Sequence, residues 1–349
     1  MASSTQEQDA PVAQRGVGVA PDGEAQAGEA DFPQVVDPYR RELLAHCYRM
    51  TGSVHDAEDL VQETYLRAWR AYHAFEGRSS VRTWLYRIAT NVCLTALEGK
   101  QRRPLPMGLG APAGDATAPV QQNGEIPWLE PVPDAMLEAN DPAALVSERD
   151  TIRLAFVAAL QHLPARQRAV LILRDVLRWR AAEVAEALES TTASVNSALQ
   201  RAHATLDKAN LSADTVGEPT PEQKEMLDRY VQAFWDKDIE AIVSMLTKDA
   251  IWEMPPYTGW YQGAENIGTL IDTQCPGGPR DMRMLPTRAN GQPAFALYMR
   301  GEDDVFRPFH LQVLTLGPEG VEHVGAFFGA DVFATFGLPD SLPSDVVPD

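Results

Sequence analysis

The 349-residue sequence is poor in cysteine and has no long apolar run, and these scarcities exclude several classes of protein. Its three cysteines, Cys47, Cys93 and Cys275, are scattered and show neither a CxxC pair nor the spacing of zinc ligands. We therefore expect no disulfide framework, no metal and no cofactor. No apolar run approaches the ~20 residues that a membrane helix needs, and the N-terminus lacks the basic and then apolar layout of a secretory signal. These absences predict a cytoplasmic protein with no membrane partner.

Acidic residues outnumber basic ones and give a formal net charge of -19, but the charge is unevenly distributed. Residues 1–36 carry -5, residues 104–150 carry -7 and residues 211–349 carry -13, whereas 37–103 and 151–210 each carry +3. Two weakly basic blocks therefore lie within an acidic chain. These blocks are where we expect contact with nucleic acid.

Composition and periodicity divide the chain into seven segments. The first has almost no large apolar residues and is expected to be disordered. Two helical blocks follow, joined by an acidic Pro/Gly/Ala linker that we expect to be flexible. The last block begins with helices and continues into strand-like runs separated by turn residues, which is an α+β arrangement. The expected boundaries are 1–31 (disordered), 32–103 (helical), 104–140 (linker), 141–210 (helical), 211–220 (hinge), 221–338 (α+β) and 339–349 (tail).

Within the last block the pattern predicts three helices and four strands. The helices are expected at about 221–236, 238–247 and 264–275, and the strands at 281–289, 293–301, 305–317 and 320–329.

The run SSVRTWLYRIATN, residues 79–91, places arginines and aromatic residues on one expected helix that Ser80 caps. Helical spacing gives this helix an apolar stripe and an exposed row that contains Arg82, Tyr86 and Thr90. Such a row offers cations for phosphates and rings on which unstacked bases can stack. A solvated face on a bundle helix is an equal alternative by spacing alone.

A long helix is expected just before this run, over DAEDLVQETYLRAWRAYHAF. Its buried stripe is expected to include Leu60, Thr64, Trp69 and Tyr72.

These two runs, in this order and at this spacing, closely resemble region 2 of the extracytoplasmic-function (ECF) sigma factors of bacterial RNA polymerase. The resemblance spans most of residues 37–103 and implies that the first helix docks on the clamp helices of the largest polymerase subunit. It also implies that the second helix captures flipped bases of the promoter's -10 element, with phosphates held nearby. The residues implied for docking are Asp56, Asp59, Gln62 and Glu63. Those implied for the -10 element are Arg78, Trp84, Tyr86, Arg87, Asn91, Lys100, Arg102 and Arg103.

Residues 151–208 have the layout of a helix-turn-helix, with a first helix at 181–188 and a turn at 189–192. Thr192 or Ser194 is expected to cap a recognition helix that runs to about Lys208. The block resembles region 4 of the same family, which implies the polymerase flap and the -35 promoter element as partners. The residues expected at the -35 element are Thr191, Thr192, Ser194, Asn196, Ser197, Gln200 and Arg201.

Many family members carry Lys or Arg where this chain has Asn196 and Ala198. Fewer cations weaken phosphate contacts, so we expect poor DNA binding by the free protein. An alternative for the arginines of this block is that they only solubilise it; they are Arg166, Arg168, Arg174, Arg178 and Arg180.

The runs WEMPP and GWYQG, with the helix and strands that follow, resemble the SnoaL-like branch of the nuclear-transport-factor-2 (NTF2) superfamily, a cone-shaped α+β fold. Enzymes of this fold use an acid–base pair in the cone, for which Asp272, His310 and His323 are candidates. No spacing fixes such a pair, so we expect no enzyme and no catalytic residue. The implied cavity would hold a small-molecule ligand against Trp252, Met254, Tyr257, Trp260, Tyr261 and His310.

The sequence thus predicts a multidomain protein with two all-α sigma domains and a C-terminal α+β cone. Its expected function is to bind core RNA polymerase, direct it to promoter DNA and help melt the -10 element. The acidic C-terminal domain would be attracted to the basic, DNA-facing surfaces and regulate them in cis. Two alternatives stay open: a helix-turn-helix regulator that acts without core polymerase, and a SnoaL-like enzyme with a DNA-binding N-terminus.

Overall fold

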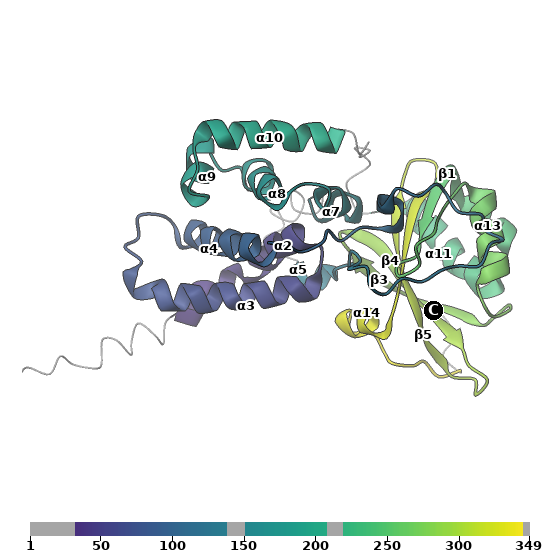
Figure 1. The fold of residues 1–349 in the computed structure, drawn as a ribbon. Coiled ribbons are helices and arrows are strands. Elements are labelled where there is room, and N and C mark those ends of the chain that lie inside the picture. Colours follow the sequence, from purple (N-terminus) through teal and green to yellow (C-terminus); the bar gives the residue numbers. More distant parts are fainter. Residues whose placement is uncertain (1–31, 138–150, 208–218, 345–349) are drawn as a thin grey trace, which may run out of the picture.

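The computed structural model describes three stretches of the chain, and all statements below concern these. They form two stacked helical blocks beside a C-terminal sheet domain (Figure 1). No helix within these stretches is both long and apolar enough to span a membrane. The segment expected to be disordered, 1–31, lies outside them, as do parts of the expected linker, hinge and tail. The described residues are 32–137, 151–207 and 219–344.

Three helices build the first block, and the middle of it is α2. Residues 43–51 of this helix are all buried, because α2 contacts helices of both blocks. Ser53 caps α3 by accepting a hydrogen bond from the backbone N–H of Asp56 at 3.1 Å. Ser80 caps α4 through the N–H of Thr83, as predicted. The elements are η1 (Asp37–Tyr39), α2 (Arg40–Thr51), α3 (Val54–Ala71), η2 (Tyr72–Ala74) and α4 (Val81–Ala96).

The second block contains the predicted helix-turn-helix, with one correction at its cap. The turn passes through Glu189 at φ 48°, and the side chain of Thr191 accepts from the N–H of Ser194. Thr191 is therefore the cap, and the expectation of Thr192 or Ser194 is wrong. The elements are α7 (Leu154–Leu160), α8 (Ala165–Leu171), the π-helical turn η4 (Ile172–Val176), α9 (Ala181–Ala187) and α10 (Thr192–Leu206).

The C-terminal domain has four helices and a six-stranded sheet in the order β2-β1-β6-β5-β4-β3. The pair β1–β6 is parallel and the other pairs are antiparallel. The α+β cone and its four predicted strands are confirmed, while β1 and β2 were not predicted. The helices are α11 (Pro221–Asp236), α12 (Ile239–Met245), α13 (Ala264–Gln274) and α14 (Ala330–Thr335). The strands are β1 (Leu246–Glu253), β2 (Trp260–Gln262), β3 (Met282–Ala289), β4 (Gln292–Arg300), β5 (Phe306–Leu316) and β6 (Val321–Phe328).

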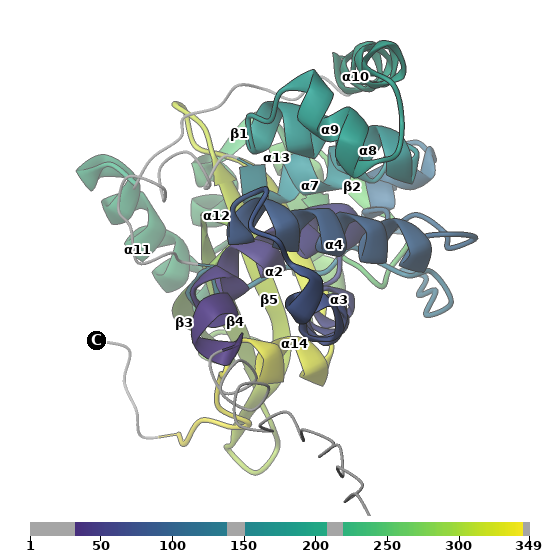
Figure 2. The same ribbon diagram turned by 90° about the vertical axis from the view of Figure 1, so that its left-hand side faces the viewer.

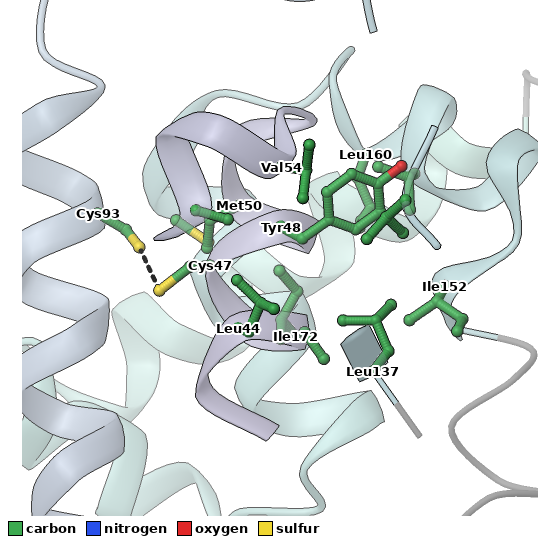
Figure 3. Close-up of a cluster of buried hydrophobic side chains, with 14 of the residues drawn as sticks. Leu44, Cys47, Tyr48, Met50, Val54, Cys93, Leu137, Ile152, Leu160 and Ile172 are labelled. Carbon is green, nitrogen blue, oxygen red and sulfur yellow. Dashed lines mark hydrogen bonds between the residues drawn. The ribbon is translucent and has the colours of Figure 1, made fainter. Parts of the chain in front are cut away.

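The two faces of the sheet have different partners. One face carries Tyr230 of α11 against Phe295, within the domain's own core. The other face belongs to one hydrophobic cluster that also contains residues of α2, α7 and α8. Figure 2 shows the helical blocks in front of the sheet. Helical blocks and sheet therefore share a core, part of which is drawn in Figure 3.

The segment between the helical blocks is not the flexible linker that the sequence predicted, over the residues the structure describes. The backbone N–H of Gly114 donates to Trp260 O at 2.7 Å, and that of Thr258 donates to Gln121 O at 2.9 Å. These bonds tie the segment to the edge of the C-terminal domain, along which it runs in Figure 1. It contains η3 (Pro106–Leu109) and α5 (Asp134–Leu137). The composition correctly indicated a polar segment, but backbone hydrogen bonds to the edge of the sheet hold it in place.

Candidate polymerase and promoter interfaces

The α3 helix presents the edge expected to dock on polymerase. Asp59 and Gln62 are exposed on it, whereas Glu63 is half-buried and pairs with Arg67 at 2.6 Å. The carboxylate of Asp56 is also paired, because it lies 3.1 Å from the guanidinium of Arg103. The structure thus leaves two of the four predicted docking residues open.

The same edge contains two apolar residues that the sequence analysis did not assign to it. Leu66 is 50% exposed and Trp69 is 45% exposed, so the expectation that Trp69 is buried is wrong. Together with Gln62 they follow at steps of four and three residues, which places them on one face of α3. Large exposed apolar side chains at helical spacing are typical of docking surfaces.

The α4 helix does not present Tyr86 to solvent, so the expectation that Tyr86 lies in an exposed row is wrong for the observed arrangement. Tyr86 is 1% exposed; its hydroxyl donates to Glu42 Oε2 at 3.1 Å, and burial raises its pKa. The guanidinium of Arg82 lies 4.9 Å from the centre of its ring, and the ring of Trp179 in the second block packs edge-on at 6.4 Å. Thr90, expected in the same exposed row, is buried too and contacts His46 Nε2 through its hydroxyl at 3.0 Å.

The remaining residues expected at the -10 element lie at or near the surface. Arg87 is exposed but forms an ion pair of 3.5 Å with Glu186 of α9. Asn91 is exposed, and Arg78 is exposed beside Glu76. Trp84 is half-buried and packs on Phe75, and Lys100 is exposed. Arg102 donates to Gly108 O. Arg103 lies between the carboxylates of Asp56 and Glu130.

The recognition helix α10 presents its predicted face openly. Val195, Ala198 and Ala202 are buried at steps of three and four residues and hold the helix on the block. All seven residues expected at the -35 element are exposed; they are Thr191, Thr192, Ser194, Asn196, Ser197, Gln200 and Arg201.

The arginines of the second block do more than solubilise it. Arg168 is 4% exposed and donates to the carbonyl oxygen of Met50, in the last turn of α2. Arg166 donates to Leu188 O, and Arg174 donates to Trp179 O. The solubilising alternative is wrong for these three residues, since they fix the block internally and against the first block.

The aromatic residues expected to line a cavity in the cone are largely packed in its core. Trp252, Met254, Tyr261 and His310 are buried, and burial lowers the pKa of His310 to about 3. Tyr257 packs on Phe328, and Trp260 Nε1 donates to Ala111 O.

A cavity of about 1150 Å³ lies instead between α7, the segment around residues 105–108 and the outer face of the sheet. On its wall the Nε2 of His323 lies 2.8 Å from Glu253 Oε1. The strand register pairs Ile251 with His323, so Glu253 and His323 share one face, which the sequence spacing did not reveal. The other oxygen of Glu253 accepts from the N–H of Met107 at 2.6 Å. With both oxygens engaged, this carboxylate fastens the segment to the sheet.

A hairpin tip that the sequence analysis did not single out joins all parts of the molecule. Asn290, between β3 and β4, is fully buried at φ 57°. Its Nδ2 donates to Tyr48 Oη at 2.8 Å in α2 and to Ile152 O at 2.7 Å before α7. Its Oδ1 accepts from the N–H of Val132 at 3.0 Å. The Asn-Gly pair at 290–291 is a signal for a tight turn, but the sequence does not show where the tip inserts.

The helix-turn-helix of α9 and α10 is stacked on a block in which α3 has an acidic edge and α4 has arginines and aromatic residues. This combination is typical of a sigma factor. Residues 35–103 match the family model of sigma-70 region 2, and residues 153–206 match that of sigma-70 region 4. Over 315 residues the chain is 58% identical to the ECF RNA polymerase sigma factor SigG of Mycobacterium tuberculosis, covering 89% of this chain and 85% of the relative. The chain belongs to the ECF RNA polymerase sigma factors.

A second relative shares the three-part fold. The ECF sigma factor SigJ of Mycobacterium tuberculosis is 31% identical over 213 residues, which is 60% of either chain. Its crystal structure superposes with a TM-score of 0.56 at 23% identity, covering 90% of this chain and 100% of that chain. The described arrangement of helical blocks and sheet domain therefore corresponds to a fold seen in a solved sigma factor.

Proposed function

We propose that this chain binds core RNA polymerase through the exposed edge of α3 and directs it to promoters. In this proposal α10 enters the major groove of the -35 element and the α4 surface holds the melted -10 element. The observation that carries the proposal is the open polar face of α10, whose seven exposed residues lie on the side opposite its buried stripe.

Part of the -10 surface must open before it can act, because Tyr86 is buried although Arg78 and Asn91 are exposed. Trp179 packs against Tyr86, and Glu186 pairs with Arg87. In the proposed cycle, binding to polymerase separates the two blocks and exposes the α4 surface. A partner that binds only the separated form shifts the population toward it by its differential affinity.

The C-terminal domain regulates this opening in cis in our proposal. Asn290 hydrogen-bonds to α2, to the start of the second block and to the intervening segment at once, so it favours the arrangement in which they meet. This contact through Asn290 differs from the predicted electrostatic attraction between the acidic C-terminal domain and the DNA-facing surfaces, since the recognition face of α10 is exposed. A buried, hydrogen-bonded tip is also less sensitive to salt than surface attraction.

A small-molecule ligand of the C-terminal domain remains part of the proposal. The cavity of about 1150 Å³ is bounded by the sheet and by α7, so a ligand there would contact both.

The function is tested by transcription with purified chain, core polymerase and promoter fragments. We expect promoter-specific transcripts that disappear when Asp59→Lys removes the docking charge, while Asp228→Lys on the exposed face of α11 leaves them unchanged. Tight, sequence-specific binding to duplex promoters without polymerase, and no transcript with it, would favour the regulator alternative and contradict the proposal.

A further inference from the structure

A second, smaller cavity lies where the two helical blocks and the intervening segment meet. Its volume is about 490 Å³, within the range of about 300–1,000 Å³ that small-molecule sites occupy. It lies beyond the end of α4 and beside the turn between α7 and α8. Its lining includes the charged residues Asp56, Lys100, Arg102, Arg103, Glu125 and Arg168.

The lining is basic in a chain that is strongly acidic overall. Four cations face two carboxylates of the lining; Asp56 is shared by Arg103 at 3.1 Å and Lys100 at 3.5 Å, and Arg103 also pairs with Glu130 outside the lining at 3.3 Å. Arg102 contacts only neutral groups in the described structure, Gly108 O at 2.7 Å and His162 Nδ1 at 2.9 Å. The lining therefore keeps an excess of positive charge.

Arg168 is the buried part of this charge. Its guanidinium contacts only carbonyl and amide oxygens, those of Met50, Gln161 and Leu163, and among the described residues no carboxylate pairs with it. Its buried Nε has no hydrogen-bond partner, and burial lowers its pKa to about 10, so the group stays charged at neutral pH. A buried cation without a counter-ion is costly, and an anion nearby would reduce that cost.

We propose that this cavity binds a small phosphate-bearing molecule, of the class of inorganic pyrophosphate or a nucleoside polyphosphate. Its phosphate oxygens accept hydrogen bonds from Lys100 and Arg102, and its negative charge offsets that of Arg168. Guanidinium and ammonium groups are the side chains that recognise phosphate. Because both helical blocks supply walls of the cavity, the bound molecule stabilises their closed packing. The site does not depend on the promoter function proposed above.

The test is calorimetric titration of the full chain with pyrophosphate and, separately, with ATP in the absence of divalent cations. We expect saturable binding that Lys100→Gln and Arg102→Gln each weaken about tenfold. The matched controls are Lys224→Gln and Arg229→Gln, exposed cations of α11, which should leave the affinity unchanged. A thermal melt of each variant without ligand verifies folding.

Three results would overturn the site. Absence of saturable binding to the wild-type chain is the first, and equal weakening in the α11 controls is the second, because it would indicate general charge attraction. The third is affinity for a short single-stranded DNA under the same conditions with no affinity for pyrophosphate or ATP, which would assign these cations to nucleic-acid phosphates. Raised melting temperature with pyrophosphate, lost in Arg102→Gln, would support the closed packing.

Discussion

The two helices that we predict to contact DNA differ in exposure. The face of α10 is open, with seven predicted contact residues exposed, whereas α4 has Tyr86 buried and Arg87 paired with the second block. Both helices have a buried apolar stripe. Tyr86 is held by Glu42 and His46 of its own block and contacted by Trp179 of the second block, whereas the polar face of α10 is exposed.

In our proposal this arrangement can engage the -35 element, but it keeps the ring of Tyr86 from the -10 element. Duplex DNA could reach α10, but a melted strand would find the ring of Tyr86 covered by Trp179. The C-terminal domain belongs to the same arrangement, since Asn290 hydrogen-bonds both to Tyr48 of α2 and to Ile152, which precedes α7.

The largest expected effect comes from removing the hairpin tip. Asn290→Ala leaves a buried N–H of Val132 and the carbonyl of Ile152 without this partner, so we expect a loss of about 2–4 kcal/mol in the free energy of unfolding. We also expect transcription output to change, because the two blocks are less firmly held together. Chemical denaturation and the transcription assay measure the two effects.

The control for this variant is Asp304→Ala. Asp304 has a similar positive φ of 60° but is exposed, and its side chain forms an ion pair of 3.5 Å with Arg300. Both alanines carry the same backbone strain of about 1 kcal/mol. Equal effects of the two variants would show that strain, and not the buried contacts, is responsible.

Acid should weaken the block beneath α4. Burial, with the nearby charge of Arg49 as a smaller cause, lowers the pKa of His46 from 6.5 to about 3. The unfolded chain then binds a proton that the folded chain does not, so stability falls by about 1.4 kcal/mol per pH unit as pH drops below 6.5. The contribution of His46 to the reduction at pH 5 is thus about 2 kcal/mol. Denaturation curves between pH 7 and pH 5 measure it.

His46→Gln should reduce that pH dependence, while His73→Gln, at an exposed position, should not. An unchanged slope in His46→Gln would refute the assignment.

Sequence patterns predicted local features, such as helix caps and exposed helix faces, and missed contacts between residues far apart in the chain. The cap at Ser80 and the exposed face of α10 follow from helical spacing, and both were predicted. Spacing also placed Tyr86 at the surface, but it cannot report that Trp179 packs on it. Asn290 belongs to the same class, because a turn signal fixes the local backbone and not the partners of the tip.

The open helix can be tested by Asn196→Ala. We expect this change to weaken discrimination among -35 sequences by about tenfold, or about 1.4 kcal/mol, since an amide that reads a base edge is lost. The matched control, Asn266→Ala in α13, should leave discrimination unchanged. Competition between promoter fragments in the presence of polymerase measures it, and an equal loss across all -35 sequences would indicate that Asn196 reads no base.

The smallest expected effect belongs to the ion pair across the blocks. Glu186→Gln should release Arg87 and favour opening by less than about 1 kcal/mol, because the pair is largely exposed. Glu183→Gln should not favour opening, because Glu183 pairs with Arg180 at the start of the same helix. Salt titration of promoter melting measures the difference; a smaller degree of melting in Glu186→Gln would contradict the role of this pair.

The central claim is that the covered α4 surface opens when the sigma factor works. The most direct measurement is the distance between spin labels at Thr95→Cys near the end of α4 and Ala204→Cys on α10, in a chain with Cys275→Ser. We expect one short distance in the free chain and a longer one in complex with core polymerase and promoter DNA. An unchanged distance in a complex that initiates transcription would contradict it.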